Sequence, residues 1–284
     1  MYGYSADSTS MRIATNVSSI AAQRSMRKTG DKVNQAYAEL SSGSRINKAA
    51  DDAAGLAISE LMRAQIRSKG QARRNANDSV SFLQVANGGL NEVHAILNRF
   101  KELAIQSAND TVSDKERAMV DMEYQELSDE INRIATSIEF NGKHLLSDEV
   151  TDLEFQVDTH NKASNRVTYR SDKLNTSISA LGLSGTNLRT KSSSQNVINK
   201  ISNAITRVSE RRSELGAVES RVQSTINNLD LSQHNIEASN SRIRDTDFAM
   251  STSNKTKNEI IMNANTMTLA QSNTLPGMAA KLIG

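Results

Sequence analysis

The 284-residue chain contains no cysteine, no tryptophan and a single proline, and aromatic residues make up only 4% of it. The absence of cysteine excludes a disulfide framework and any metal site with thiolate ligands. A globular enzyme of this length usually has a core richer in aromatic residues. No apolar run approaches the roughly 18–20 residues of a membrane span. The first residues also lack an apolar signal segment, so we expect neither a membrane anchor nor a cleaved secretory signal.

Charge and composition favour long helices over a binding or catalytic module. Charged residues make up 23% of the chain and its net charge is +2, with no basic tract interleaved with aromatic residues. We therefore expect no nucleic-acid partner. The four histidines are scattered without zinc-binding spacing, and Gly88–Gly89 lies inside a helical pattern rather than a phosphate loop. No catalytic, cofactor or metal site is predicted. Gly88–Gly89 is interpreted as a close approach between helix backbones.

Three central segments have apolar residues at alternating spacings of three and four, the pattern of a left-handed coiled coil. The third segment repeats every seven residues from Ile201 to Ile243 without a slip. The pattern predicts a mainly α fold of long antiparallel coiled-coil helices that form a rod. Ser113 and Glu116 are placed as a capping box at the start of the second helix. The residues predicted to form the bundle seam are Leu90, Val93, Leu97, Ile131, Ile134, Leu215, Val222 and Leu229.

One stretch departs from the helical period. Leu153, Phe155 and Val157 alternate with polar residues, as do Val167 and Tyr169. This alternation predicts a β-hairpin within a region at about 150–185. A single hairpin is marginal in water, so it must pack against the helices.

The two ends of the chain, residues 12–40 and 258–283, are amphipathic at helical spacing, but their apolar stripes are thin and diluted by small polar residues. Such stripes bury too little area to offset their own ordering entropy. We expect these segments to be disordered in a monomer and ordered in a polymer of many copies. The residues expected to mediate this assembly are Ile13, Val17, Ile20, Leu269, Leu275 and Leu282.

Two non-helical joints, at 41–47 and 243–250, lie at mirrored distances from the termini. Gly43 ends the first helix, and Asp51 and Asp52 stand where the cap of the next helix belongs. We therefore predict one domain formed by residues 1–52 with 245–284. Residues 53–244 form the second, a helical rod.

Several long motifs, in order along the chain, resemble bacterial flagellin. They are RIATNVSSIAAQRSM, LSSGSRINKAADDAAGLAIS, QARRNANDSVSFLQVANGGLNEV, FNGKHLL, SALGL and SRIRDTDFAMSTS. The resemblance implies a structural subunit of an extracellular flagellar filament, exported unfolded by the flagellar type III apparatus without a cleaved signal peptide. It implies as partners other flagellin subunits and paralogues, an export chaperone, and the filament cap and hook–filament junction proteins. Only Leu188–Asn196 separates the hairpin region from the third helix, which is typical of a minimal, two-domain form.

The segment LNRFKELAIQSAN at 97–109 resembles the stretch that a host Toll-like receptor contacts in recognised flagellins. By position, Arg99, Leu103 and Glu123 match receptor-contact residues, and the same surface packs between subunits in the family. Two alternatives remain. A hook–filament junction protein shares the N-terminal helical pattern, and some flagellins carry a metallopeptidase insert, although no such insert or motif is found here.

Overall fold

The computed structural model describes residues 15–147, 153–169 and 174–283. The chain divides into two units, one of residues 1–63 with 237–284 and one of residues 64–236. Both boundaries fall inside long helices. The helices are α1 (Val17–Ser42), α2 (Ala53–Ser107), α3 (Asp114–Ser137), α4 (Ile178–Leu181), α5 (Lys191–Arg244) and α6 (Phe248–Ile283), with the short 3-10 helix η1 (Ala163–Asn165). The strands are β1 (Glu139–Phe140), β2 (Lys143–His144), β3 (Leu153–Gln156) and β4 (Arg166–Tyr169).

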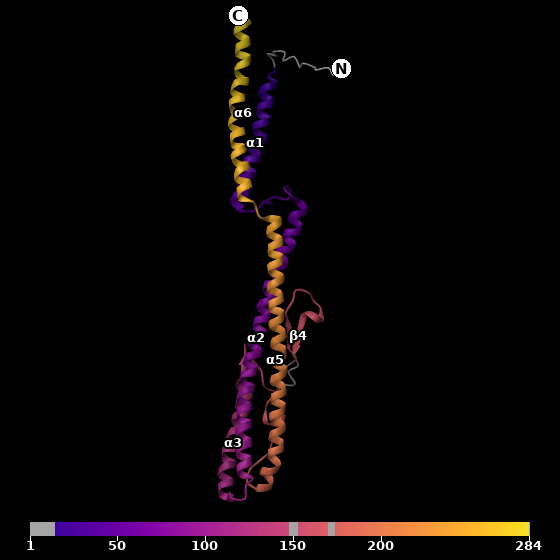
Figure 1. Ribbon diagram of the computed structural model, residues 1–284, viewed down its shortest axis with the longest axis vertical. Coiled ribbons are helices and arrows are strands. Elements are labelled where there is room, and N and C mark those ends of the chain that lie inside the picture. The colour runs from indigo at the N-terminus through magenta and orange to yellow at the C-terminus, as the bar shows by residue number, and fades with distance from the viewer. Residues whose placement is uncertain (1–14, 148–152, 170–173, 284) are drawn as a thin grey trace. The chain divides into compact units, whose positions relative to one another are not determined.

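In the unit of residues 1–63 and 237–284, α1 and α6 lie side by side and antiparallel (Figure 1). The side chain of Asn16 caps α1 by accepting from the backbone N–H of Ser19 at 3.0 Å. Gly43 ends α1 in the left-handed conformation with φ of 67°, as expected from the sequence. Glycine suits this position because other residues adopt positive φ at a cost.

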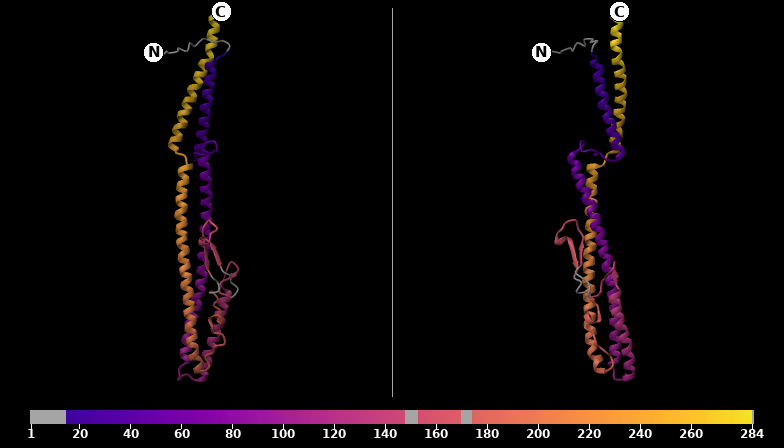
Figure 2. Two further views of the ribbon diagram at one scale, coloured as in Figure 1. Left: turned by 90° about the vertical axis from the view of Figure 1, so that its right-hand side faces the viewer. Right: turned by 180° about the vertical axis from the view of Figure 1, so that it is seen from behind.

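In the unit of residues 64–236, α2, α3 and α5 lie side by side (Figures 1 and 2). Arg99 pairs with Glu123 of α3, while Arg73 pairs with Asp230 of α5. A second contact, from Gln84 to Glu219, places α2 and α5 antiparallel. The predicted antiparallel, mainly α fold is therefore confirmed.

The predicted seam residues are all buried in this unit. Leu229 is buried, at 5% exposed, but is not one of the core cluster that includes Leu90, Val93, Leu97, Ile131, Ile134, Leu215 and Val222. The heptad spacing thus predicted the buried face of α2, of α3, and of α5 as far as Leu229, whereas Ile236 and Ile243 at the end of the predicted run are only half-buried. Phe100 and Tyr124 stack across α2 and α3, with ring centroids 4.2 Å apart.

The helix starts follow the capping chemistry of the sequence in two cases. Ser113 Oγ accepts from the N–H of Glu116, whose carboxylate accepts from the N–H of Ser113 at 2.7 Å, which completes the predicted capping box. Asp52 accepts from the N–H of Gly55 at 2.8 Å at the start of α2. Asp51 is not part of that cap. Its carboxylate accepts from the N–H groups of Asn47 and Lys48 and closes the preceding turn.

The prediction of a close backbone approach at Gly88–Gly89 is wrong in its detail. Gly88 is exposed with open space around it. A Cβ on Gly89 would lie 2.2 Å from Ile138 Cδ1 and 2.7 Å from Leu146 Cδ1. Gly89 therefore makes room for side chains that follow α3, not for another helix backbone.

The predicted hairpin is present as β3 and β4, which pair antiparallel with Phe155 opposite Val167. Phe82 of α2 contacts Phe155 and Phe140 edge to face, with centroids 5.6 and 5.7 Å apart, and so holds this region against the helix. The sequence analysis missed β1 and β2, which pair around Asn141 and Gly142. Both turn residues have positive φ, so the Asn-Gly pair was the available signal.

Candidate assembly surfaces

The contact face between α1 and α6 is made of small and polar side chains. The buried residues of α1 recur at heptad spacing but are mostly small: Ser19, Ala22, Thr29, Val33 and Ala36. On α6, the buried residues among the described side chains are Ser251 and Ser272, which are also small and polar. Little apolar area is removed from water here, so hydrophobic burial stabilises this pair of helices only weakly.

Side-chain hydrogen bonds join the two helices along their length instead. They connect residues whose numbers sum to nearly the same value, which fixes one antiparallel register. The bonds are Ser19 Oγ to Asn273 at 2.9 Å, Asn265 Nδ2 to Thr29 Oγ1 at 3.3 Å, Tyr37 OH to Glu259 at 3.0 Å, and Ser251 Oγ to Glu39 at 3.1 Å. Lys255 also lies over the Tyr37 ring, 4.5 Å from its centroid.

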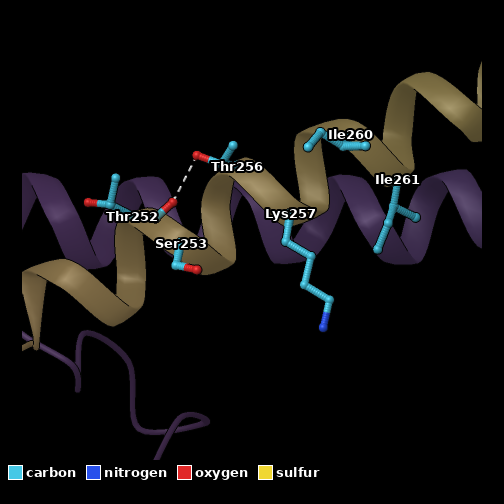
Figure 3. A pocket seen from close by; sticks show the side chains of 6 residues that line it. All are labelled: Thr252, Ser253, Thr256, Lys257, Ile260 and Ile261. Carbon is cyan, nitrogen blue, oxygen red and sulfur yellow. Dashed lines mark hydrogen bonds between the residues drawn. The ribbon is translucent and has the colours of Figure 1, made fainter.

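Several larger apolar side chains of both helices are instead exposed. Val17 is 59% exposed, although Val33 on the same helix is 6% exposed. On α6, Ile260 and Ile261 line a shallow hollow with Thr252, Ser253, Thr256 and Lys257 (Figure 3). Among the described side chains, the large exposed apolar residues of the pair are Val17, Ile20, Phe248, Met250, Ile260, Ile261 and Met267, together with Tyr37, whose OH reaches across to Glu259.

The residues predicted to mediate assembly fall in different places. Val17 and Ile20 lie on the outward face. Leu269 is half-buried and lies four residues after Asn265 and three before Ser272, on the face of α6 that contacts α1. Ile13 lies outside the described residues, as do the side chains of Leu275 and Leu282.

The two joints next to this helix pair meet each other. Arg45 N–H donates to the carbonyl of Arg244 at 2.7 Å, and Thr246 N–H donates to the carbonyl of Gly43 at 3.0 Å. The Arg45 guanidinium also donates to the carbonyl of Ile243 at 2.8 Å, near the C-terminal end of α5. These bonds join segments about 200 residues apart in the sequence.

An ion-pair cluster lies beside these joints. Arg244 contacts Glu60 at 2.6 Å and Arg63 contacts the same carboxylate at 3.0 Å. The guanidinium groups of Arg244 and Arg63 hold the pKa of Glu60 below its usual value. Nothing in the sequence spacing of Glu60 and Arg244 predicts this cluster.

Of the three residues predicted to form a receptor or subunit surface, two are exposed and one is buried. Arg99 and Glu123 are half-exposed and form an ion pair at 2.7 Å, and the hydrogen bonds that Arg99 donates to Glu123 and to Glu102 raise its pKa. Leu103 is 1% exposed and packs in the core, so its assignment to that surface is wrong. Phe100 and Ala104 are buried beside it, because α2 contacts more than one element at this level.

The buried carboxylate of Asp121, which no sequence pattern indicates, joins α3 to the segment just before α5. Asp121 accepts from the backbone N–H of Leu188 at 2.8 Å and from Arg189 Nε at 2.8 Å. Burial raises the pKa of Asp121, but the hydrogen bonds from Leu188, Arg189 and Gln125 outweigh it and hold the pKa below its usual value. The apolar spacing of α3 includes Val120, but it does not indicate that the next residue, Asp121, is buried.

Residues 13–151 match the family described as the bacterial flagellin N-terminal helical region, and residues 198–283 match the bacterial flagellin C-terminal helical region. The chain is also 40% identical to a flagellin of Halalkalibacterium halodurans, over 96% of this chain and all of the relative. The chain belongs to the bacterial flagellin family. It shares 37% identity with a flagellar filament core protein of Brachyspira hyodysenteriae, over 96% of this chain and the whole of that protein.

Among solved structures, the chain resembles a flagellar hook-associated protein of Vibrio parahaemolyticus with a TM-score of 0.57. The match covers 69% of this chain and all of that one, at 13% identity, so it supports the fold alone.

Flagellins form a family of structural proteins. In the ranges 15–147, 153–169 and 174–283, no group of three or more histidine, aspartate or glutamate residues is arranged to hold a metal ion. Among the helices of the same residues, none combines the length and the apolar character needed to cross a bilayer.

Proposed function

We propose that this chain is a structural subunit that self-assembles into a bacterial flagellar filament, with α1 and α6 as the segments that pack between copies. The observation that supports this most strongly is the outward face of the helix pair. Val17, Ile20, Ile260 and Met267 are exposed, while the face between the two helices holds small polar residues. Large exposed apolar residues gathered on one element indicate an interaction site.

The energetics explain why a polymer suits these helices. Burying one valine, isoleucine or methionine side chain contributes about 1.5–3 kcal/mol, more than a neutral hydrogen bond contributes on average. Packing the outward faces against other copies would therefore stabilise α1 and α6 more than their contact within one chain does. Residues 1–52 and 245–284 are accordingly proposed as the polymerising domain and residues 53–244 as the helical domain outside it.

The remaining partners follow from family membership and are part of the proposal. They are paralogous flagellins, an export chaperone, the filament cap and the hook–filament junction proteins. We propose export of the unfolded chain by the flagellar type III apparatus to an extracellular filament, and no enzymatic activity. A host Toll-like receptor would contact the surface of Arg99 and Glu123, without Leu103.

Deletion of residues 265–284 tests the proposal. The deletion removes the part of α6 that bonds to Ser19 and Thr29 and carries Met267. The truncated chain should remain soluble, should lose little helicity beyond the removed segment, and should not add to filament seeds. Normal elongation of seeds by the truncated chain would refute the role of α6 in the polymer.

A further inference from the structure

One surface of α3 combines exposed methionines with unpaired carboxylates. Met119, Met122, Glu126 and Asp129 recur at spacings of three and four, within an arc of about 80° at roughly 100° per residue. Met119 is 67% exposed and Met122 is 64% exposed. Glu126 and Asp129 are exposed, and neither has an ion-pair or hydrogen-bond partner in the part of the chain that the structure describes. We refer to these four residues as the acidic stripe.

A segment of α2 has the opposite character. Residues 67–74 contain four basic residues and no acidic one, while residues 119–130 contain five acidic residues and no basic one. Arg73 is neutralised by Asp230 of α5. Arg74 donates only to the neutral side chain of Gln71, and Arg67 is exposed and contacts no acidic group among the described residues. Arg67 and Arg74 are seven residues apart and so share one side of α2; we refer to them as the basic pair.

The acidic stripe and the basic pair cannot meet within one chain. The contact between Arg99 and Glu123, on antiparallel helices, places Glu126 beside α2 at about residue 96. At about 1.5 Å per residue along α2, that point is roughly 30–45 Å from Arg74 and Arg67. No side chain spans this distance, so within the described part of a single copy neither charged surface neutralises the other.

A second copy displaced along the direction of α2 would bring the two surfaces together. A repeated head-to-tail contact of this kind joins different surfaces of the two copies and produces an open helical filament. We propose that the acidic stripe of one copy packs on the basic pair of the next, with Glu126 and Asp129 facing Arg67 and Arg74. This proposal rests on the filament function above and names the two surfaces of one of its contacts.

The chemistry of the stripes suits this partner. Methionine side chains are flexible and adapt to an uneven surface, so Met119 and Met122 supply buried area beside the charges. The charges give register and direction, because a like-charge juxtaposition is disfavoured. Since these charges lie near water, salt should weaken the contact, with a screening length of about 10 Å at 0.1 M.

Charge reversal in the full-length chain provides the test. An acid-reversed chain carries Glu126→Lys and Asp129→Lys, and a base-reversed chain carries Arg67→Glu and Arg74→Glu. Alone, each presents like charges at every head-to-tail contact, so its critical concentration for seeded polymerisation at low salt should rise at least about tenfold. Mixed in equal amounts, the two chains can alternate with opposite charges at every contact, and the mixture should polymerise near the wild-type concentration.

The controls separate this contact from general effects of charge. Glu210→Lys reverses an exposed carboxylate on α5 and should leave the critical concentration unchanged. Raising the salt concentration should reduce the defect of each reversed chain, and thermal melting should show that both fold. The inference is refuted if either reversed chain polymerises alone as the wild type does, or if the mixture does no better than its parts. If the wild-type chain itself did not polymerise, the proposed function would fail instead.

Discussion

Val17 and Val33 belong to the same helix, α1, yet Val17 is exposed and Val33 is buried against α6. Sixteen residues apart, they lie about 160° from each other around the helix. The inward face therefore serves the contact within one chain, and the outward face is the one that we propose packs against other copies. This two-faced arrangement is the central structural feature of the terminal helices.

The first prediction concerns the protection of these helices. Because their mutual contact is small and polar, residues 1–44 and 250–284 should be cleaved by limited proteolysis in the monomer and protected in the filament. The core of about 53–244 should survive in both. Mass spectrometry of the fragments measures this, and equal protection of the ends in monomer and filament would contradict it.

The second prediction concerns the seam of α5. Leu215 is 1% exposed, so Leu215→Asp places an unpaired carboxylate in the core and should cost about 3–5 kcal/mol of unfolding free energy. Ser213 is exposed, and Ser213→Asp should change it by less than about 0.5 kcal/mol. Thermal circular dichroism of the monomer compares the two variants, and similar melting temperatures would show that the assigned register is wrong.

The third prediction uses the adjacent glycines of α2. Gly89→Ala forces Ile138 and Leu146 to move and should destabilise the monomer by about 1–3 kcal/mol. Gly88→Ala adds a methyl group in open space within a helix and should stabilise it by about 0.5–1 kcal/mol. Chemical denaturation measures both, and opposite signs are the expected result. A destabilised Gly88→Ala chain would contradict the packing described for this turn.

The fourth prediction concerns pH and Asp121. Its pKa is lower in the folded chain than in an unfolded one, where it is about 3.9. The stability that it provides is therefore fully present above the unfolded pKa and is lost as the pH falls through the folded pKa. As the pH is lowered below about 4, the melting temperature of the wild type should decrease. Asp121→Asn should make the melting temperature less dependent on pH.

The matched control for Asp121 is Asp129→Asn. Asp129 is exposed and has no partner among the residues that the structure describes. This variant should keep the wild-type pH dependence of melting. If it flattens the profile as much as Asp121→Asn does, the buried contacts of Asp121 with Leu188 and Arg189 are not the source of the effect.

The long helices and their seams were predictable because heptad spacing reports which face of a helix is buried. Leu103 was assigned to the surface by its position in the family resemblance, and neither that position nor the spacing within one helix shows how many neighbours the helix has. Where further elements pack against α2, the buried face widens and includes Leu103 beside Phe100 and Ala104. The β1–β2 hairpin was predictable from Asn141 and Gly142, because an Asn-Gly dipeptide strongly favours a hairpin turn.

The polar contacts were beyond sequence reasoning for a different reason. Asp121 meets Arg189, and Arg45 meets Ile243, only after distant segments have packed together. No local pattern relates such residues. Of the residues predicted to mediate assembly, Val17 and Ile20 are exposed in one chain, whereas Leu269 is half-buried.

Seeded elongation by the Ile260→Asp chain tests the outward face of α6 most directly. Ile260 is 64% exposed in one chain, so a carboxylate there should leave the monomer's melting unchanged. In a filament the same carboxylate would be buried among other copies without a partner. The account predicts that this chain does not elongate wild-type seeds, whereas Ser213→Asp does. Elongation by Ile260→Asp at the wild-type rate would contradict the account.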